Sequence, residues 1–340
     1  MQNKRIVLAA HPNPDVTPSC FALDEVPVPD LNPGDVLVRN IYLSCDPYMR
    51  GRMLPSRTYA DPFAIGEVIP ARVVGQVHES RNPQFPVGCF VWSFLGWEQY
   101  TRVANGQNLN QIDDSIRPLS HAISIMGMPG LTAWVGMMRI GQPQPGETVF
   151  VSAASGAVGQ IAGQLARLAG ARVVGSVGSE HKRQHLLERL NFDAAFNYRE
   201  SGYESELDRA CPNGIDVYFE NVGGVALEAV LPRLTIGARI PVCGMISRPG
   251  GSTLAGIRGI ECLISKRAEM TGFLVYDHMH HMPRYLEQMG RLMAEEKIVY
   301  FEDIIDGLEN TPGAFIEMLC GKNIGKRLVR ISDDPNLGTD

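Results

Sequence analysis

Residues 149–175 read "VFVSAASGAVGQIAGQLARLAGARVVG", and this stretch decides the fold. Its β-branched start predicts a buried strand, which runs into the small residues from Ala154 to Gly159. The apolar positions that follow recur at helical spacing, and Gly170 supplies a C-cap before the next strand. Small residues let backbone N–H groups approach a pyrophosphate at a helix N-terminus, where the helix dipole favours anions. A lone glycine motif would suit any tight turn, but the flanking strand and helix favour a dinucleotide site.

Strands and helices alternate around this unit from about residue 128 onward. We predict strands at 148–154, 171–177, 194–198, 215–221, 238–244 and 269–275. The helices are expected at 157–169, 180–190, 203–210, 223–234 and 279–295. Six strands joined by right-handed crossovers make a doubly wound parallel sheet, so the fold class is α/β with a complete Rossmann domain.

The beginning of the chain has a different rhythm. Its first 125 residues or so are rich in Pro and Gly and break into short alternating runs such as "GDVLVRNIYL" and "ARVVGQVHES". This pattern predicts an antiparallel, barrel-like β domain. The last 40 residues return to short β runs, which we expect to fold back onto that domain. The expected domains are 1–127 together with 298–340 for the substrate, and 128–297 for the dinucleotide.

Composition limits the classes of partner. The chain has 340 residues, which suggests two domains, and a net charge of −6, which provides no basic surface for nucleic acid and no polybasic membrane anchor. Residues 148–166 are uncharged over about the length of a membrane span, but polar residues and glycines interrupt them. The seven cysteines are scattered, without a C-x-x-C pair, so a reducing cytoplasm is expected. We therefore expect a small-molecule partner.

The segment "VVGSVGSEHKRQ", residues 173–184, bears on the choice of cofactor. NAD-specific sites place Asp or Glu about 20 residues after the glycine motif, where it binds the ribose hydroxyls. No carboxylate lies between Gly175 and Ser179, while Lys182 and Arg183 follow within one helical turn. Because an adenosine 2′-phosphate needs a cation and open space, NADPH is favoured over NADH. The alternative is that Lys182 is an ordinary solvated surface residue.

Seven blocks in order carry a family resemblance. They are "DPYMRGRM" (46–53), "GMPGLTAW" (127–134), "AASGAVGQ" (153–160), "ENVGG" (220–224), "CGMIS" (243–247), "GFLV" (272–275) and "GLENTPGAFIEMLCGKNIGKRLVRI" (307–331). In these blocks the chain resembles the zinc-independent, NADPH-dependent double-bond reductases of the medium-chain dehydrogenase/reductase superfamily, which include prostaglandin, alkenal and curcumin reductases. The resemblance implies a GroES-like β domain beside the Rossmann domain, and a homodimer.

The resemblance also implies site residues, carried over where the blocks match. Pyrophosphate contacts would come from Gly156, Ala157, Val158 and Gly159, and contacts to the 2′-phosphate from Lys182 and Tyr198. The nicotinamide ribose would be lined by Asn221, Cys243, Met245 and Ser247, with Phe273, Leu274 and Val275 behind the ring and Asn323 closing the site. One departure is Pro249, which stands where the family commonly has a tyrosine after "CGMIS". The role of that tyrosine would be vacant or reassigned here.

A catalytic metal is not expected. Zinc-dependent relatives use a first-domain Cys, a Gly-His-Glu segment and a later Cys, because an open zinc site needs three convergent ligands. Cys45 is available, but the comparable segment, Ile65-Gly66-Glu67, has no histidine. "DHMHHM" (277–282) is clustered but resembles the start of a surface helix. A thiol nucleophile is also disfavoured, because no His or basic residue is identifiable beside Cys45.

Reduction of a conjugated C=C bond needs no Lewis acid. Hydride goes to the β-carbon, and the resulting enolate needs hydrogen-bond donors and a later proton. Tyrosine is an uncharged donor at neutral pH, so Tyr48 and Tyr59 are the candidate catalytic residues; the alternative for each is a packed aromatic ring. Arg50 and Arg52 could hold an anionic group, but ion pairs within the β domain are the favoured interpretation.

The leading hypothesis is an NADP-dependent oxidoreductase acting on CH-CH donors, which reduces the C=C bond of α,β-unsaturated ketones or aldehydes. One alternative is an NADPH-dependent quinone reductase, which uses the same fold and cofactor. A second, of another class, is a cofactor-binding protein without catalysis that has a regulatory or structural role. The intact set of cofactor segments argues against the second alternative.

Overall fold

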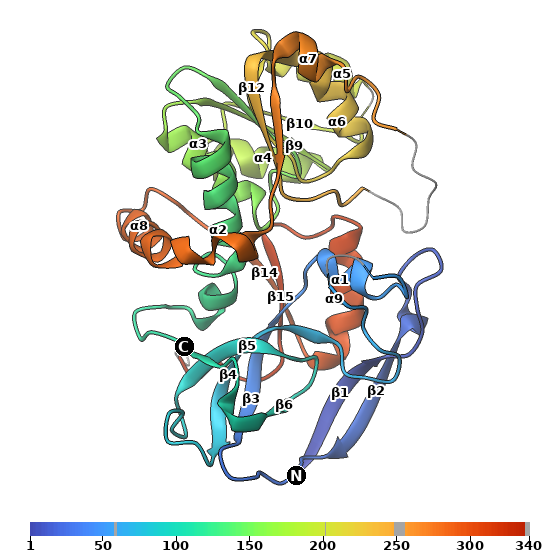
Figure 1. Cartoon of the computed structure of the whole chain (residues 1–340), viewed down its shortest axis with the longest axis vertical. Coiled ribbons are helices and arrows are strands. Elements are labelled where there is room, and N and C mark those ends of the chain that lie inside the picture. Colours follow the sequence, from blue (N-terminus) through green and yellow to red (C-terminus); the bar gives the residue numbers. More distant parts are fainter. Residues whose placement is uncertain (58–59, 201, 248–255, 337–340) are drawn as a thin grey trace. The chain divides into compact units, whose positions relative to one another are not determined.

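The computed structural model describes residues 1–57, 60–200, 202–247 and 256–336 (Figure 1). The chain divides into two compact units, one of Met1–Ser124 with Glu302–Asp340 and the other of Ile125–Phe301. From the sequence we expected the divisions at 127/128 and 297/298. None of the helices in the described ranges is long and apolar enough to cross a membrane.

The second unit is built on a parallel sheet with the strand order β10-β9-β8-β11-β12-β13. Its strands are β8 (Thr148–Val151), β9 (Arg172–Val177), β10 (Ala194–Asn197), β11 (Ile215–Phe219), β12 (Leu234–Val242) and β13 (Glu269–Gly272). Every pairing in it is parallel. Numbered within the sheet the order is 3-2-1-4-5-6, which confirms the predicted doubly wound Rossmann fold.

Helices cover both faces of this sheet (Figure 1). The five predicted helices are present as α3 (Gly159–Leu168), α4 (Glu180–Glu188), α5 (Tyr203–Ala210), α6 (Gly224–Val230) and α8 (Met282–Ala294). Ile161 of α3 and Leu186 of α4 belong to one apolar core, while Leu207 of α5 and Leu227 of α6 belong to another. The sequence interpretation did not specify α2 (Met128–Val135), the π-helical η4 (Gly136–Gly141) or α7 (Cys262–Lys266).

Several predicted boundaries were wrong, for local reasons. β8 ends at Val151, three residues early, and Ala153 in the turn after it has a left-handed φ of 47° that a strand cannot contain. The helix predicted at 223–234 ends at Val230, because the short 3₁₀ segment η5 (Leu231–Arg233) precedes β12. The histidine-rich stretch forms the 3₁₀ segment η6 (Val275–His281), and α8 starts only after it.

The first unit is a β domain. A two-stranded antiparallel sheet joins β1 (Gln2–Leu8) to β2 (Phe21–Pro27). A larger sheet has the order β14-β15-β3-β4-β5-β7, with β6 also pairing with β3, and only its β14–β15 pair is parallel. These strands are β3 (Val36–Ser44), β4 (Pro70–Ser80), β5 (Phe90–Gly96), β6 (Tyr100–Val103), β7 (Asn110–Gln111), β14 (Glu302–Asp306) and β15 (Lys326–Arg330).

Residues from both ends of the sequence share the core of this unit. Trp97 is buried, and its ring centroid lies 5.7 Å from Phe21 and 5.8 Å from Phe315. Phe315 belongs to α9 (Thr311–Leu319), a helix that the sequence interpretation missed between the two late β runs. Aromatic burial therefore attaches the last segment to the β domain, together with the pairing of β15 with β3.

The remaining short elements of this unit lie in its connections. They are η1 (Pro18–Cys20), α1 (Tyr48–Arg52), η2 (Ala104–Gly106), η3 (Leu119–Ile123) and η7 (Leu308–Asn310). The α1 helix directly follows β3 and carries the "YMRGR" residues of the first family block. It therefore places one candidate catalytic residue, Tyr48, at the end of a central strand.

Candidate functional site

The glycine turn after β8 is shaped for close approach of a ligand to the backbone. A Cβ at Gly159 would lie 2.6 Å from the carbonyl oxygen of Ala153, and one at Gly156 would lie 3.2 Å from the same atom. Gly156, Ala157 and Val158 are partly exposed at the N-terminal end of α3. Because a helix of ten residues begins there, its dipole favours an anion at this turn. These residues fit a pyrophosphate.

Lys182 lies in the first turn of α4, and the structure overturns its interpretation as a solvated surface residue. Only 8% of its surface is exposed, and its backbone N–H donates to the side chain of the N-cap residue Ser179 (3.3 Å). Its neighbour Arg183 instead forms a two-pronged ion pair with Glu180, with both N···O distances 2.7 Å. Of these two cations, Lys182 is therefore the one whose side chain is enclosed near the end of β9.

Tyr198 comes close to the same loop from the end of β10. Its hydroxyl oxygen would lie 3.0 Å from a Cβ at Gly178, and its backbone N–H donates to the carbonyl of Val177 (2.8 Å). The side chain remains 42% exposed. The ends of β9 and β10 thus bring a phenol and a glycine together, beside the helix that carries Lys182. A tyrosine hydroxyl and an ammonium group are both donors to phosphate oxygens.

The loops after β11 and β12 are hydrogen-bonded to each other. Asn221 receives a hydrogen bond from the Cys243 thiol, and Ser247 is bonded to the carbonyl of Val222 by both its N–H (3.0 Å) and its hydroxyl (2.5 Å). Met245 packs so that its Cε would lie 2.9 Å from a Cβ at Gly223. The structure therefore brings together all four residues that the resemblance assigns to the nicotinamide ribose.

The Cys243 thiol is held in its neutral form. Its burial first, and then the charge of Glu220, raise the pKa of this thiol above its usual range. A neutral thiol can donate its hydrogen to the amide oxygen of Asn221, as the geometry requires. Cys243 is therefore a donor within this loop, and its environment does not activate it as a nucleophile.

The segment after β13 continues the same edge of the sheet. The N–H of Phe273 donates to the carbonyl of Val242 (3.4 Å), and the Phe273 ring lies edge-on to His278 with centroids 6.1 Å apart. Leu274 is 43% exposed, whereas Val275 is half-buried at the start of η6. Because all strands of the sheet are parallel, their carboxyl ends lie at the edge where such folds bind nucleotides.

In the first unit, Cys45 is buried, and its thiol is not activated for reaction. Burial raises the pKa of its thiol to about 12, although the charge of Lys326 acts in the opposite direction. The ammonium group of Lys326 donates to the Cys45 carbonyl (2.6 Å) and to the carboxylate of Asp46 (2.8 Å). Lys326 is thus a cation near Cys45 that the sequence interpretation did not identify. Its ammonium group is hydrogen-bonded to the Cys45 carbonyl and to Asp46. The expectation that Cys45 is not a nucleophile agrees with this environment.

Of the two candidate catalytic tyrosines, only Tyr48 lies within the described residues. Tyr48 begins α1, is half-buried, and packs against the apolar core of the first unit. Tyr59 lies outside the described residues, as does Pro249. Asn323 is half-buried in the loop before β15, where its amide donates to the carbonyl of Gly325 (2.7 Å). The catalytic roles of both tyrosines, and the role of Asn323 toward the cofactor, stay predictions.

The arginines beside Tyr48 have partners within the β domain. Arg50 lies 3.8 Å from the carboxylate of Asp15, which confirms the predicted ion pairing for this residue. Arg52 donates from Nε to the carbonyl of Asp61 (2.9 Å), and its guanidinium carbon lies 4.4 Å from the centroid of the Phe63 ring. Both side chains therefore have structural contacts within the β domain.

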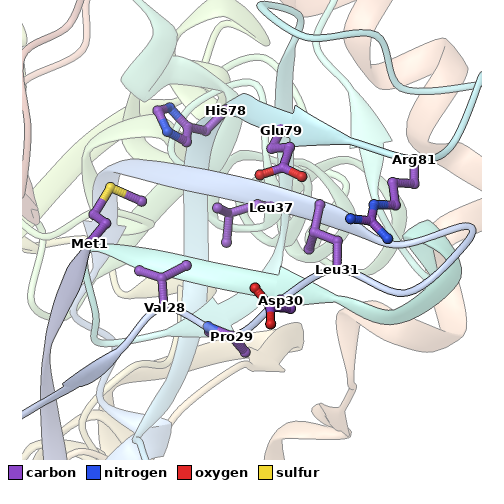
Figure 2. Close-up of a pocket in the computed structure, with 9 residues that line it drawn as sticks. All are labelled: Met1, Val28, Pro29, Asp30, Leu31, Leu37, His78, Glu79 and Arg81. Atoms are coloured by element: carbon purple, nitrogen blue, oxygen red, sulfur yellow. The ribbon is translucent and has the colours of Figure 1, made fainter.

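No group of three or more His, Cys, Asp or Glu side chains within the described ranges is arranged to hold a metal ion. A cavity of about 190 Å³ lies in the first unit, lined by Leu37 of β3, by His78 and Glu79 of β4, and by Met1 and Arg81 (Figure 2). Among the described residues that line this cavity, none belongs to the predicted site. This cavity therefore gives no information about the predicted site.

The sequence interpretation missed Ser152 and Glu220, which the structure places beside Asn221. Both are completely buried, and the Ser152 hydroxyl lies 3.1 Å from a carboxylate oxygen of Glu220. The signal that could have found Glu220 is a carboxylate one residue beyond the apolar strand Ile215–Phe219. A charged residue at that position needs an explanation, because uncompensated burial of a carboxylate is costly.

The fold and these loops define a dinucleotide-dependent oxidoreductase of two units. Residues 4–112 match the family described as the N-terminal domain of oxidoreductase, and residues 157–295 match the family described as zinc-binding dehydrogenase. The chain is 47% identical over 300 residues to the NADP(+)-dependent 2-alkenal reductase of Nicotiana tabacum, covering 88% of each. It is 41% identical to the NADPH-dependent curcumin reductase of Escherichia coli K12, covering 98% of each chain.

A solved structure agrees with these relatives. CurA from Vibrio vulnificus, in complex with NADPH, superposes with a TM-score of 0.93 at 40% identity, over 97% of this chain and 100% of that chain. The chain therefore belongs to the medium-chain dehydrogenase/reductase superfamily, in its zinc-independent double-bond reductase branch. By contrast, a quinone oxidoreductase of Escherichia coli at 20% identity, with a TM-score of 0.75 over 96% of this chain and 99% of that chain, shares the fold alone.

Proposed function

We propose that this protein is an NADPH-dependent reductase of the C=C bond in α,β-unsaturated ketones or aldehydes. The observation that carries the proposal is the 47% identity to a 2-alkenal reductase, over 88% of each chain. The glycine turn, Lys182 and the Asn221 loop supply the matching cofactor segments. When bound, NADPH supplies the hydride that the β-carbon of the substrate receives.

In this proposal residues of the second unit hold the cofactor, together with Asn323 of the first unit. The turn from Gly156 and the start of α3 accept the pyrophosphate, because backbone N–H groups at a helix N-terminus favour an anion. The ammonium of the buried residue Lys182 and the phenol of Tyr198 donate to the 2′-phosphate, which accounts for a preference for NADPH over NADH. The positions proposed for the nicotinamide end are Asn221, Cys243, Met245, Ser247, Phe273, Leu274, Val275 and Asn323.

The chain must also stabilise the negative charge that develops on the carbonyl oxygen of the substrate. A hydroxyl donor suits this task, because it is neutral in the resting enzyme and acts only as the charge appears. We propose Tyr48 or Tyr59 for this role. Removing one such donor typically costs roughly 2.7–4 kcal/mol of transition-state stabilisation.

A spectrophotometric screen tests the proposal. Oxidation of NADPH and of NADH is followed with a short enal, a cyclic enone, a long-chain enone and a quinone as acceptors. Turnover of the enal or an enone with NADPH, undiminished after exhaustive chelation, is the expected result. Preference for the quinone would favour the quinone-reductase alternative, and no oxidation with any acceptor would favour a non-catalytic cofactor-binding protein.

A homodimer and a cytoplasmic location are further proposals. β13 pairs only with β12 among the described strands, so one edge of the six-stranded sheet offers backbone groups to a second copy. All seven cysteines are free thiols, which suits a reducing compartment. Light scattering coupled to size-exclusion chromatography tests the first proposal, and cell fractionation tests the second. A monomer at micromolar concentration would contradict the dimer.

A further inference from the structure

Glu220 is a buried carboxylate to which the proposed function assigns no role. It directly follows β11, and its surface is completely inaccessible to solvent (0% exposed). Burying a carboxylate is unfavourable unless hydrogen bonds or opposite charges compensate it. Within the described ranges Glu220 forms no ion pair, so its hydrogen bonds indicate what it does.

All of those hydrogen bonds are made by one oxygen, and they hold one loop. Oε1 of Glu220 accepts from the backbone N–H of Val222 (2.5 Å) and of Gly223 (3.0 Å), and lies 3.1 Å from the hydroxyl of Ser152. The loop needs such an anchor, because Gly223 is left-handed (φ 74°) and α6 begins at the next residue. A single carboxylate oxygen therefore fixes the backbone from 222 to 223.

The same network reaches the side chain of Asn221. The Ser152 hydroxyl accepts from the backbone N–H of Asn221 (2.9 Å), and the Ser152 carbonyl accepts from its side-chain amide (2.7 Å). With the amide donor engaged in this way, the amide oxygen points to the thiol of Cys243. Two hydrogen bonds to Ser152 thus set the orientation of the Asn221 side chain. Ser152 is in turn hydrogen-bonded to Glu220.

The second carboxylate oxygen contributes nothing to this network. Oε2 of Glu220 is buried and takes no part in the hydrogen bonds to Val222, Gly223 and Ser152. After burial itself, the charge of Glu220 is the next cause that raises the pKa of the Tyr203 and Tyr218 hydroxyls, so the groups lie near one another. The contacts of this carboxylate that bear on the loop are therefore those of Oε1, with the N–H groups of Val222 and Gly223 and the hydroxyl of Ser152.

We infer that Glu220 is a positioning residue for the cofactor, acting through the 221–223 loop and Ser152 on the side chain of Asn221. The inference rests on the proposed function, because it assumes that Asn221 meets the nicotinamide end of NADPH. Glu220 itself touches only protein groups. Its removal should therefore change the affinity for the cofactor and leave the chemical step largely unaltered.

Two substitutions at this position test the inference. Glu220→Gln keeps an acceptor oxygen for the N–H groups of Val222 and Gly223, and its amide can donate to a tyrosine hydroxyl. Glu220→Leu keeps the volume but leaves both N–H groups without an acceptor. The Kd for NADPH, from titration of its fluorescence, should rise roughly tenfold to a hundredfold in the Leu variant and stay within about threefold in the Gln variant. With an enone, KM for NADPH should rise in parallel while kcat at saturation stays within about threefold.

A stability control separates positioning from general destabilisation. Met289→Ala removes a completely buried side chain of α8 in the same unit and should lower the melting temperature without changing the Kd. If the Leu variant does not fold, Ser152→Ala removes only the hydroxyl link and should raise the Kd by roughly threefold to tenfold.

The outcomes distinguish this inference from the proposed function. If the wild-type protein neither binds NADPH nor reduces an enone, the proposed function fails before Glu220 is considered. If the wild-type protein does both and a folded Glu220→Leu variant binds NADPH with the same Kd, the positioning role is wrong. An equal loss of affinity in the Gln and Leu variants would also overturn it, because the argument depends on the acceptor oxygen.

Discussion

The thiol of Cys243 donates a hydrogen bond to the side-chain oxygen of Asn221, with an Sγ–Oδ1 distance of 2.8 Å. This bond joins the loop after β12 to the loop after β11, and it forms between residues 22 positions apart in the sequence. It is the direct contact between two positions that we propose for the nicotinamide ribose.

Replacing the donor in this bond should loosen the cofactor loop. Cys243→Ala leaves the Asn221 oxygen without its donor, whereas Cys243→Ser retains one. We expect Cys243→Ala to weaken NADPH binding by roughly threefold to tenfold, because a neutral hydrogen bond contributes about 0.5–1.5 kcal/mol. The Kd from fluorescence titration is the measurement. Equal affinities for the Ala variant and the wild type would show that the bond does not matter for the cofactor.

Lys182 should decide between the two nicotinamide cofactors. Lys182→Ala removes the enclosed cation, so KM for NADPH should rise roughly tenfold to a hundredfold while KM for NADH changes little. The matched control is Arg183→Ala, one residue further along α4, whose side chain is already paired with Glu180. Steady-state kinetics with both cofactors measure the effect. A similar loss in both variants would point to general electrostatics and away from a specific phosphate contact.

Tyr48 should affect the chemical step. If its hydroxyl stabilises the enolate, Tyr48→Phe lowers kcat for an enone by roughly 10²–10³-fold with NADPH affinity unchanged. The Tyr59→Phe variant, measured in the same way, assigns the role between the two candidates. Should each single variant and the double variant keep at least one-third of wild-type kcat, neither hydroxyl is the donor.

Gly163 offers a test of the core that is independent of catalysis. A Cβ at this position of α3 would lie 2.0 Å from the ring of Phe192, so Gly163→Ala must shift one of the two. We expect a loss of about 1–3 kcal/mol in the free energy of unfolding, measured with urea. Gly313→Ala in α9 is the control, since its added Cβ meets nothing within 4 Å and should be neutral or stabilising. An unchanged stability for Gly163→Ala would contradict the close packing of α3.

The ion pair between Asp46 and Lys326 should give stability a measurable pH dependence. Burial opposes ionisation of Asp46, but the charge and hydrogen bond of Lys326 outweigh it and keep the Asp46 pKa below its usual value. A carboxyl with a lowered pKa stabilises the fold above its unfolded pKa of about 3.9, and this contribution is lost as pH falls through the folded pKa.

Asp46→Asn should therefore destabilise the protein by about 3–5 kcal/mol at pH 7, because it leaves the buried ammonium of Lys326 without its opposite charge. The difference from the wild type should shrink as the pH falls below about 4. Urea unfolding at several pH values checks this, with Asp61→Asn as the control because the Asp61 side chain is 78% exposed. A difference that does not vary with pH would exclude the ion pair as its source.

Much of the second unit follows from local sequence. The β-branched run before Gly156, the small residues of the turn and the helical spacing after it predict a strand, a glycine turn and a helix, and each forms close to its expected place. Local sequence signals suffice there because strands and helices alternate along the chain, and elements that are consecutive in sequence pack next to each other. The errors lie at boundaries such as Val230, where a proline and a short 3₁₀ segment end a helix that propensity would have extended.

The sequence by itself determined the fold class and the family, since those depend on motifs that can be read segment by segment along the chain. Only the tertiary structure showed the surroundings of the individual side chains. Lys326 lies 280 residues from Asp46 and pairs with it, Lys182 is enclosed, and Glu220 meets Ser152 from 68 residues away. Burial and hydrogen bonding depend on what surrounds a side chain in three dimensions, so the local pattern could mark Glu220 as unusual but could not identify its partners.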